Sequence, residues 1–354
     1  MDSRSVRHVL AAYDWLPSCL GPIQPLGNAG GFSGAELWRI EFPDQWLCLR
    51  RWPASHPSRS RLEFIHQVLF HAHRKGFRQF PLPYRTRDQR TFVSYEQRLW
   101  ELTPWIAGRA DFDTIPAGSE QQQRRLRQAM QTLGHFHRAT EDFPRADREG
   151  PAPGIVRRAD LLQQFVQEAD QLVFLVQQAA DVAPWLEELR ASAAQFLRAA
   201  IERAPHILPA IQNLRRDLFV LQPCIRDIWH DHVLYDGDRV SGLIDFGALE
   251  IDNVSVDIAR LLGSLIADEE AFWPLGLASY ESVRPLCPGE RQSITACDAV
   301  NAILSGVQWC RWLYVDGVDF SAANRPPQQL ENRVRRLFAR MDKPGAGPAI
   351  SRTL

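Results

Sequence analysis

Lysine is nearly missing from this chain of 354 residues: Lys75 and Lys343 are the only two, so arginine carries almost all of the positive charge. Basic and acidic residues are interspersed and nearly balanced, with a formal net charge of −1. Proteins that bind DNA or RNA normally need a basic face, which such a balance does not supply. The composition therefore predicts a protein with no nucleic-acid partner.

Long hydrophobic runs are also lacking. No apolar stretch approaches the roughly 20 residues that a membrane-spanning helix needs, and the first residues mix charged with apolar side chains, unlike a secretory signal. The cysteines form no Cys-x-x-Cys pair, which is typical of reduced thiols in a chain of this length. These absences predict a cytoplasmic protein with no membrane partner. The six cysteines are Cys19, Cys48, Cys224, Cys287, Cys297 and Cys310.

The chain does contain a large apolar fraction, 45%, which is enough for a substantial core. The first hundred residues alternate short apolar runs with turns, around one helical pattern at 60–76. Long helical patterns follow from there on. We therefore expect an α+β fold of two lobes: a small antiparallel β lobe with one main helix at 1–102, a larger, mainly helical lobe carrying a catalytic hairpin at 103–342, and a disordered tail at 343–354.

The most informative segment is 224–247. Asp236-Gly237 lies there between two β-prone runs, which is a strong signal for a β-hairpin. Pairing of the two runs brings the ends of the segment together in space. Asp227 and His232, before the first strand, are then expected near Asp245, just after the second.

Two carboxylates and an imidazole at one end of a hairpin suit phosphoryl transfer. In that reaction the protein has little covalent chemistry to perform, so it positions the reacting groups and neutralises developing charge. One carboxylate holds Mg²⁺ against the phosphates, and the second accepts a hydrogen bond from the attacking hydroxyl and takes its proton. Because Mg²⁺ prefers oxygen ligands, Asp245 is suited to the first role.

These residues also carry a resemblance to a known family. Arg226-Asp227, the polar residue His232, and Asp245-Phe246-Gly247 have the spacing of the catalytic loop and metal motif of protein-kinase-like enzymes. With Val256-Asp257-Ile258-Ala259, the segment resembles in particular the aminoglycoside phosphotransferase and choline-kinase-like group. The resemblance implies a two-lobed protein-kinase-like fold, with Asp227 as the catalytic base and Asp245 and His232 as Mg²⁺ ligands. It also implies that Asp257 braces the active site.

The same resemblance assigns ATP to the first lobe. The glycine-rich turn would cover the phosphates with backbone N–H groups at Gly30, Gly31 and Ser33. Arg50 replaces the strand lysine that pairs the phosphates, and Glu63 on the following helix would be its partner. Adenine would meet the backbone of a hinge between the lobes, which includes Glu101 and Leu102.

Two of these assignments have a plainer alternative. If the register of the strand slips by one residue, Arg51 takes the inward position in place of Arg50. Glu63 is equally compatible with a solvated position on its helix.

Three residues depart from the family pattern. His232 stands where asparagine is expected, Arg50 where lysine is expected, and Ile225 where histidine is expected two residues before the base. They motivate a second interpretation, a pseudokinase that binds nucleotide but transfers little or no phosphate. A third interpretation takes His230 and His232, alternate residues that share a face of a strand, as ligands of a metal hydrolase.

The favoured interpretation is an enzyme that uses ATP and Mg²⁺ to phosphorylate a hydroxyl of a small polar metabolite. The resemblance allows an amino sugar, an amino alcohol, homoserine or a sugar as acceptor. We expect the acceptor site in the helical lobe, within 105–210 and 265–315. Four residues are candidates for contacting the acceptor: Glu250, Asp252, Trp309 and Trp312.

Overall fold

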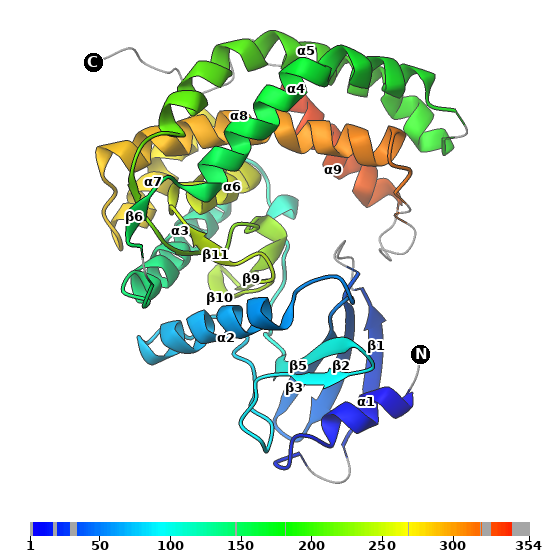
Figure 1. Ribbon diagram of the computed structural model, residues 1–354, viewed down its shortest axis with the longest axis vertical. Coiled ribbons are helices and arrows are strands. Elements are labelled where there is room, and N and C mark those ends of the chain that lie inside the picture. Colours follow the sequence, from blue (N-terminus) through cyan, green and yellow to red (C-terminus); the bar gives the residue numbers. More distant parts are fainter. Residues whose placement is uncertain are drawn as a thin grey trace. The chain divides into compact units, whose positions relative to one another are not determined.

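The computed structural model describes residues 3–16, 20–28, 34–145, 147–180, 182–267, 269–318, 320 and 327–341 (Figure 1). The chain forms two compact units. The first comprises Met1–Asp111, Asp231–Gly247 and Phe320–Arg325, and the second comprises Phe112–His230, Ala248–Asp319 and Pro326–Leu354. The division into lobes at residue 102 stays a prediction, and the tail expected at 343–354 lies outside the described residues.

The first unit is built on a five-stranded antiparallel sheet of order β1-β2-β3-β5-β4. Alternation along β3 decides what each face carries, because successive side chains point to opposite faces. Leu47 and Leu49 are fully buried on one face, so Cys48 and Arg50 point to the other. The strands are β1 (Ile23–Gly27), β2 (Glu36–Phe42), β3 (Gln45–Arg51), β4 (Val93–Tyr95) and β5 (Arg98–Pro104).

Each face of this sheet is associated with its own apolar cluster. The short helix α1 (Ser3–Leu10) contributes Val6, Val9 and Leu10 to a cluster with the buried leucines of β3. The longer helix α2 (Arg59–Arg74) contributes Leu62 to a second cluster with Trp52. Its first turn is capped by Ser58, whose side chain accepts a hydrogen bond from the Arg61 amide. The expectation of a small antiparallel lobe with one main helix is confirmed.

The expected hairpin is present, but it groups with this first unit and not with the helical part that was expected to carry it. It consists of β9 (Val233–Asp236) and β10 (Arg239–Leu243), with Asp236 paired to Arg239 across a two-residue turn. Gly237 has φ +59°, the left-handed conformation that such a turn requires. Backbone hydrogen bonds tie the hairpin to the rest of the unit, from the Leu243 amide to the Gln79 carbonyl and from the Arg109 amide to the Tyr235 carbonyl.

The second unit is mainly helical, as expected. Its α-helices are α3 (Glu120–Thr140), α4 (Pro153–Gln178), α5 (Pro184–Leu214), α6 (Ser255–Ile266), α7 (Trp273–Glu281), α8 (Pro288–Tyr314) and α9 (Pro327–Ala339). Short strand pairs join β6 (Glu149–Gly150) to β7 (Phe219–Val220) and β8 (Gln222–Cys224) to β11 (Glu250–Asp252). Single turns of 3₁₀ helix lie at η1 (Phe112–Thr114), η2 (His230–His232) and η3 (Glu270–Phe272).

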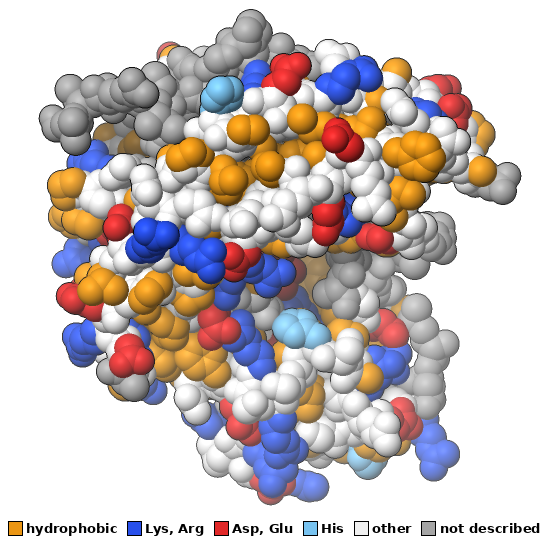
Figure 2. Space-filling view, turned by 45° about the horizontal axis from the view of Figure 1, so that its top comes forward, with side chains coloured by type: hydrophobic (Ala, Val, Ile, Leu, Met, Phe, Trp, Pro, Cys, Tyr) orange, Lys and Arg blue, Asp and Glu red, His pale blue; other side chains and the backbone are white. Residues whose placement is uncertain are grey.

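The molecular surface matches the balanced composition. Figure 2 shows basic and acidic side chains interspersed over the visible face, with hydrophobic side chains between them. Within the described residues, no helix combines the length and the apolar character that a membrane crossing requires.

Candidate active site

Arg50 lies between two carboxylates in the first unit. Its Nε is 3.7 Å from Oε1 of Glu101, and its Nη1 is 3.6 Å from Oδ1 of Asp245. The guanidinium also lies over the ring of Trp52, 4.7 Å from its centroid. Burial alone would lower the pKa of Arg50, but the two carboxylates raise it above the usual range. A phosphate arriving here would therefore meet a permanent positive charge.

The buried carboxylate of Glu101 is held from its other side by α2. Nε2 of His66 lies 2.8 Å from Oε2 of Glu101, and Nδ1 lies 2.7 Å from the hydroxyl of Thr91. Since a carboxylate can only accept, Nε2–H donates to Glu101, and Nδ1 shares a second hydrogen bond with the Thr91 hydroxyl. Burial would raise the pKa of Glu101, but the hydrogen bond from His66 and the charge of Arg50 lower it. Glu101 is therefore the ionised partner of Arg50.

This geometry corrects the assignment of Glu63 as that partner. Glu63 lies on the exposed side of α2, whereas His66, three residues later, lies on the buried side with Leu62 and Ile65. The contact between α2 and Arg50 is therefore indirect: His66 of α2 contacts Glu101 of β5, and Glu101 contacts Arg50. The register of β3 confirms that Arg50, rather than Arg51, faces this site, because Arg51 pairs with Glu36 instead.

Asp245 combines an unusual backbone with a guanidinium and an imidazole as neighbours. Its φ of +63° is rare for a residue other than glycine and is typical of strained functional positions. Oδ2 lies 3.6 Å from Nε2 of His232, at the start of the hairpin. Burial would raise the pKa of Asp245, but Arg50, His232 and the Gly247 amide together lower it. The hairpin thus brings the two expected metal ligands together, as the sequence predicted.

These two residues fit a cation site only in part. A carboxylate and an imidazole 3.6 Å apart can bind one ion, and the carboxylate oxygens suit Mg²⁺. Imidazole nitrogen is better suited to transition metals. Among the described residues, one group of three or more possible ligands has its donor atoms within 4.8 Å of one another: His137, Cys224 and Asp257, all buried. His230 belongs to no such group, which gives the metal-hydrolase interpretation no support.

A small pocket lies behind Arg50 in the first unit. It measures about 40 Å³, room for a few water molecules but far below the roughly 300 Å³ or more of a typical ligand pocket. It is lined by Arg50, Trp52, Leu62, Ile65, His66, Leu69, Pro81, Pro83, Glu101, Thr103, Asp245, Phe246 and Gly247. Gly247 is required for this packing, because a Cβ there would lie 3.1 Å from the Trp52 ring.

The structure places Glu101 and Leu102 inside β5, which argues against their role in the hinge. The Leu102 side chain is fully buried, and its carbonyl accepts a hydrogen bond from the Tyr84 amide. Glu101 is paired in register with Arg50 of β3. The Trp105 amide bonds back to Trp46, so the sheet hydrogen bonding extends past the end of β5. A backbone site for adenine is better sought after residue 103.

The predicted catalytic loop in the second unit is anchored by Asp257. Its carboxylate oxygens accept the backbone N–H groups of Ile225 and Arg226, each at 2.6 Å. Nε2 of His137 lies 3.1 Å from the same carboxylate, and both side chains are fully buried. Arg226 itself has φ +67°, a second strained position. The brace expected from Asp257 is confirmed, and it holds the two residues that precede Asp227.

Asp227, held at the end of this anchored segment, is the expected catalytic base. Its side chain is 51% exposed, so a substrate can reach it. One carboxylate oxygen forms an ion pair with Nη2 of Arg260, one turn further along α6 than Asp257. Arg260 was not predicted, although its spacing of three residues from Asp257 places both on neighbouring positions of one helix.

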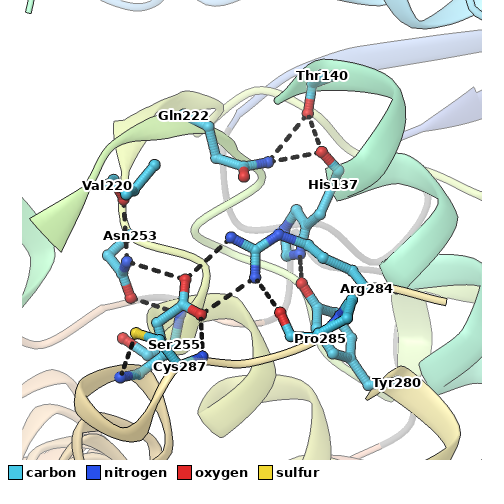
Figure 3. A network of polar contacts seen from close by, with 11 residues as sticks. His137, Thr140, Val220, Gln222, Asn253, Ser255, Tyr280, Arg284, Pro285 and Cys287 are labelled. Carbon is cyan, nitrogen blue, oxygen red and sulfur yellow. Dashed lines mark hydrogen bonds and ion pairs between the residues drawn. The ribbon is translucent and has the colours of Figure 1, made fainter. Parts of the chain in front are cut away.

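A buried polar network surrounds the start of α6 (Figure 3). Gln222 donates to the His137 carbonyl, and Nδ1 of His137 lies 2.8 Å from the Tyr280 hydroxyl. Arg284 pairs with Glu290, whose carboxylate also receives the Asn253 amide at 3.5 Å. These contacts join α3, α7 and α8 around the segment that carries Asp257, and so fix the anchor of the catalytic loop.

Asp252, a proposed acceptor ligand, instead has structural partners. It is fully buried, and Oδ1 accepts the Gly154 amide at the first turn of α4. Oδ2 lies 3.2 Å from Nε of Arg226. Burial raises the pKa of Asp252 despite the opposing effect of Arg226. Asp252 therefore caps one helix and pairs with the catalytic loop. Trp309 is similarly buried at 4% exposure, as a core residue would be.

Two expectations stay predictions. Gly30, Gly31 and Ser33 of the glycine-rich turn lie outside the described residues. Asp227 belongs to the second unit and Asp245 to the first, so their meeting across a nucleotide is a proposal, taken up below.

Comparison with known proteins identifies the relatives of this chain. The model of a family described as the phosphotransferase enzyme family matches residues 26–286. The chain belongs to the phosphotransferase enzyme family. This confirms the resemblance on which the fold and the site were predicted.

Curated relatives of this phosphotransferase include homoserine kinases. One from Pseudomonas aeruginosa is 30% identical over 190 residues, which covers 52% of this chain and 48% of that protein. One from Gluconobacter oxydans is 32% identical over 117 residues, covering 31% and 35%. The chain thus spans about half the length of the curated relatives it matches, or less.

Solved structures confirm the fold of the phosphotransferase. A spectinomycin phosphotransferase in complex with ADP and spectinomycin is similar over 97% of this chain and 96% of its own, with TM-score 0.63 and 10% identity. An aminoglycoside phosphotransferase from Alicyclobacillus acidocaldarius is similar over 95% of both chains, with TM-score 0.58 and 17% identity. At such identities the likeness speaks for the protein-kinase-like fold alone.

Proposed function

We propose that this phosphotransferase is a small-molecule kinase that transfers the γ-phosphoryl group of ATP to a hydroxyl group of a small polar metabolite. The observation that carries the proposal is the pair of short hydrogen bonds that the amides of Ile225 and Arg226 donate to the carboxylate of Asp257. A fully buried carboxylate is costly unless it is hydrogen-bonded, and two of the hydrogen bonds of Asp257 hold this one loop in place. Here the loop ends in an accessible carboxylate.

Asp227 takes the role of the base. The acceptor hydroxyl donates a hydrogen bond to its carboxylate, and the hydroxyl oxygen attacks the γ-phosphorus. As the new P–O bond forms, the bond from the γ-phosphorus to the bridging oxygen breaks, ADP leaves, and the hydroxyl proton passes to Asp227. Arg260 orients the carboxylate through its ion pair.

Asp245 and His232 hold Mg²⁺ in this proposal. The ion, when bound with ATP, neutralises charge on the phosphates. The positive charge of Arg50 binds the phosphates beside it, and Glu101 and His66 keep the guanidinium in place. Backbone N–H groups at Gly30, Gly31 and Ser33 cover the phosphates from above. The adenine edge meets backbone groups of the segment after Thr103.

The acceptor belongs to the classes that the sequence suggested: an amino sugar, an amino alcohol, homoserine or a sugar. Relatives include homoserine kinases, and the fold is shared with a microcompartment-associated aminopropanol kinase, at TM-score 0.53 and 13% identity. Both names describe small acceptors with a hydroxyl group. We place the reaction in the cytoplasm.

A pseudokinase is the second candidate. Arg50 already forms an ion pair with Asp245, and Arg260 forms one with Asp227. In a protein that binds nucleotide without transfer, these pairs would persist and keep both carboxylates from their catalytic roles. In a kinase, binding of Mg²⁺–ATP would break the ion pair of Asp245, and binding of the acceptor would break that of Asp227.

A screen of hydroxyl-bearing metabolites with γ-labelled ATP separates the two candidates. The kinase proposal predicts label on one or a few acceptors with the wild type, in the presence of Mg²⁺ or Mn²⁺, and a loss of about 10²–10⁴ in rate with Asp227→Asn. Nucleotide binding with no turnover on the whole panel would instead establish the pseudokinase.

A further inference from the structure

Three arginines of the second unit lie near the segment that carries Asp227. Arg226 precedes it in the chain, and Arg260 forms an ion pair with it. Arg158, on α4, is close enough to Arg226 and Arg260 for both charges to lower its pKa, in addition to the effect of its burial.

Two of these three guanidinium groups have a carboxylate partner. Arg226 lies 3.2 Å from Asp252, and Arg260 contacts Asp227. Arg158 has neutral partners instead: its Nε donates to Oδ1 of Asn301 at 2.8 Å and its Nη1 donates to the Gly154 carbonyl at 2.9 Å. Among the described residues, no carboxylate lies within ion-pair distance of Arg158. Its charge is therefore only partly compensated by the more distant Asp252.

Hydrogen-bond donors beside Arg158 are also unsatisfied. Nδ2 of Asn301 and Nε of Arg260 are buried and have no hydrogen-bond acceptor among the described residues. A buried N–H group without an acceptor costs about 1–3 kcal/mol, and a ligand with acceptor oxygens would remove this cost. The charge of the Arg158 guanidinium is only partly compensated, and N–H groups without acceptors lie nearby. Such a site is suited to a planar anion, which an arginine binds through two parallel hydrogen bonds.

We infer that the acceptor of this kinase carries a carboxylate group, which Arg158 and Asn301 bind while Asp227 accepts the proton of its hydroxyl. The inference rests on the proposed function and narrows it. A hydroxy acid or a hydroxyl-bearing amino acid fits this site. A polycationic amino sugar or a simple amino alcohol would place its ammonium groups beside Arg158 and Arg260, where like charges repel.

The test compares acceptors that differ only in charge. Matched four-carbon primary alcohols ending in a carboxylate, a carboxamide or an ammonium group are assayed for ADP formation, together with every acceptor found in the wider screen and its amide. We expect kcat/KM to be at least about tenfold higher for the carboxylate member of a pair, since one charge-assisted contact is worth about this much.

Variants assign the preference to one side chain. Arg158→Gln is expected to reduce the ratio of acid to amide to near one, mainly by raising KM for the acid, and Arg158→Lys is expected to retain part of it. Arg157→Gln, an exposed neighbour on the same helix, is the matched control and should keep the wild-type ratio. Circular dichroism and thermal unfolding of each variant show whether α4 remains folded.

Binding measurements keep this inference separate from the proposed function. Calorimetric titration with the four-carbon acid and amide reports the preference without any turnover, and Arg158→Gln should abolish it. If transfer occurs but the best acceptors are neutral or cationic, or if Arg158→Gln keeps the preference, the inference is overturned and the kinase stands. If no acceptor is phosphorylated at all, the proposed function fails, and the titration still decides whether Arg158 binds carboxylates.

Discussion

The carboxylate of Asp257 lies 2.6 Å from the backbone nitrogen of Arg226, the residue immediately before the proposed base. Asp257 lies in the first turn of α6, and its second oxygen receives the Ile225 amide at the same distance. One buried side chain thereby fixes the position from which Asp227 extends. The strained φ of Arg226, +67°, persists because these hydrogen bonds hold it.

Asp257→Asn should destabilise the protein strongly. The amide can accept at one oxygen only, so one backbone N–H loses a charged acceptor and the new NH₂ group faces another donor. We expect a loss of about 3 kcal/mol in the free energy of unfolding, measured with urea. The control is Asp160→Asn, an exposed member of a surface ion pair with Arg215, which should change stability by less than about 1 kcal/mol. Equal effects of the two substitutions would contradict the anchoring role.

Gly154→Ala tests the close approach between α4 and Asp252. A Cβ at residue 154 would lie 2.5 Å from Oδ2 of Asp252 and 3.1 Å from Nη1 of Arg158, so we expect a destabilisation of about 1–3 kcal/mol. Gly289→Ala, at the start of α8, meets no atom within 4 Å. It should be neutral or stabilising by up to about 1 kcal/mol, because alanine is the better helix former. If thermal unfolding shows the same change for both, the packing argument is wrong.

A local sequence signal predicted the hairpin, and the family resemblance predicted the brace. Asp236-Gly237 specifies a turn within a few residues, and the position of Asp257 at a helix start can be seen from the chain alone. The helical periodicity also predicted helices over 160–180 and 184–203. The structure has α4 beginning earlier, at Pro153, and α5 beginning at the predicted Pro184 but continuing to Leu214 through Pro205 and Pro209.

Contacts between segments that are far apart in the chain could not be predicted from the sequence. Glu101 lies opposite Arg50 because of the register of β3 against β5. His66 contacts Glu101 because it lies on the buried side of α2. Periodicity alone could not rank Glu63 below His66, since adjacent turns of a helix offer both. Arg158 reaches its site because Asp252, far along the chain, caps the helix that carries it.

Acidification should reveal which glutamate supports Arg50. The folded-state pKa of Glu101 lies below the ordinary value of 4.5, so its carboxylate stabilises the fold fully above that pH. This contribution is lost as the pH falls through the lower folded-state pKa. Urea midpoints measured from neutral pH down to about pH 3 should therefore fall less steeply for Glu101→Gln than for the wild type. Glu63→Gln, on the exposed side of α2, should follow the wild-type curve; the opposite pattern would restore Glu63 as the partner.

His232→Asn should lower the concentration of Mg²⁺ that transfer requires. An amide oxygen is a better ligand for this ion than an imidazole nitrogen, so the Mg²⁺ concentration for half-maximal transfer should fall severalfold, and the relative activity with Mn²⁺ should decline. His230→Asn, two residues away, provides the control and should leave the metal dependence unchanged. If His232→Asn has no effect on the dependence on either ion, His232 is not a ligand.

The most direct test of the proposed reaction compares Asp227→Asn with Asp245→Asn. Transfer of label from γ-labelled ATP and binding of ATP with and without Mg²⁺ are measured for both variants and the wild type. We predict that Asp227→Asn binds Mg²⁺–ATP like the wild type but loses about 10²–10⁴ in transfer rate, whereas Asp245→Asn loses the effect of Mg²⁺ on ATP binding as well as transfer. Wild-type transfer by Asp227→Asn, or Mg²⁺-dependent ATP binding by Asp245→Asn, would contradict the roles assigned to these carboxylates.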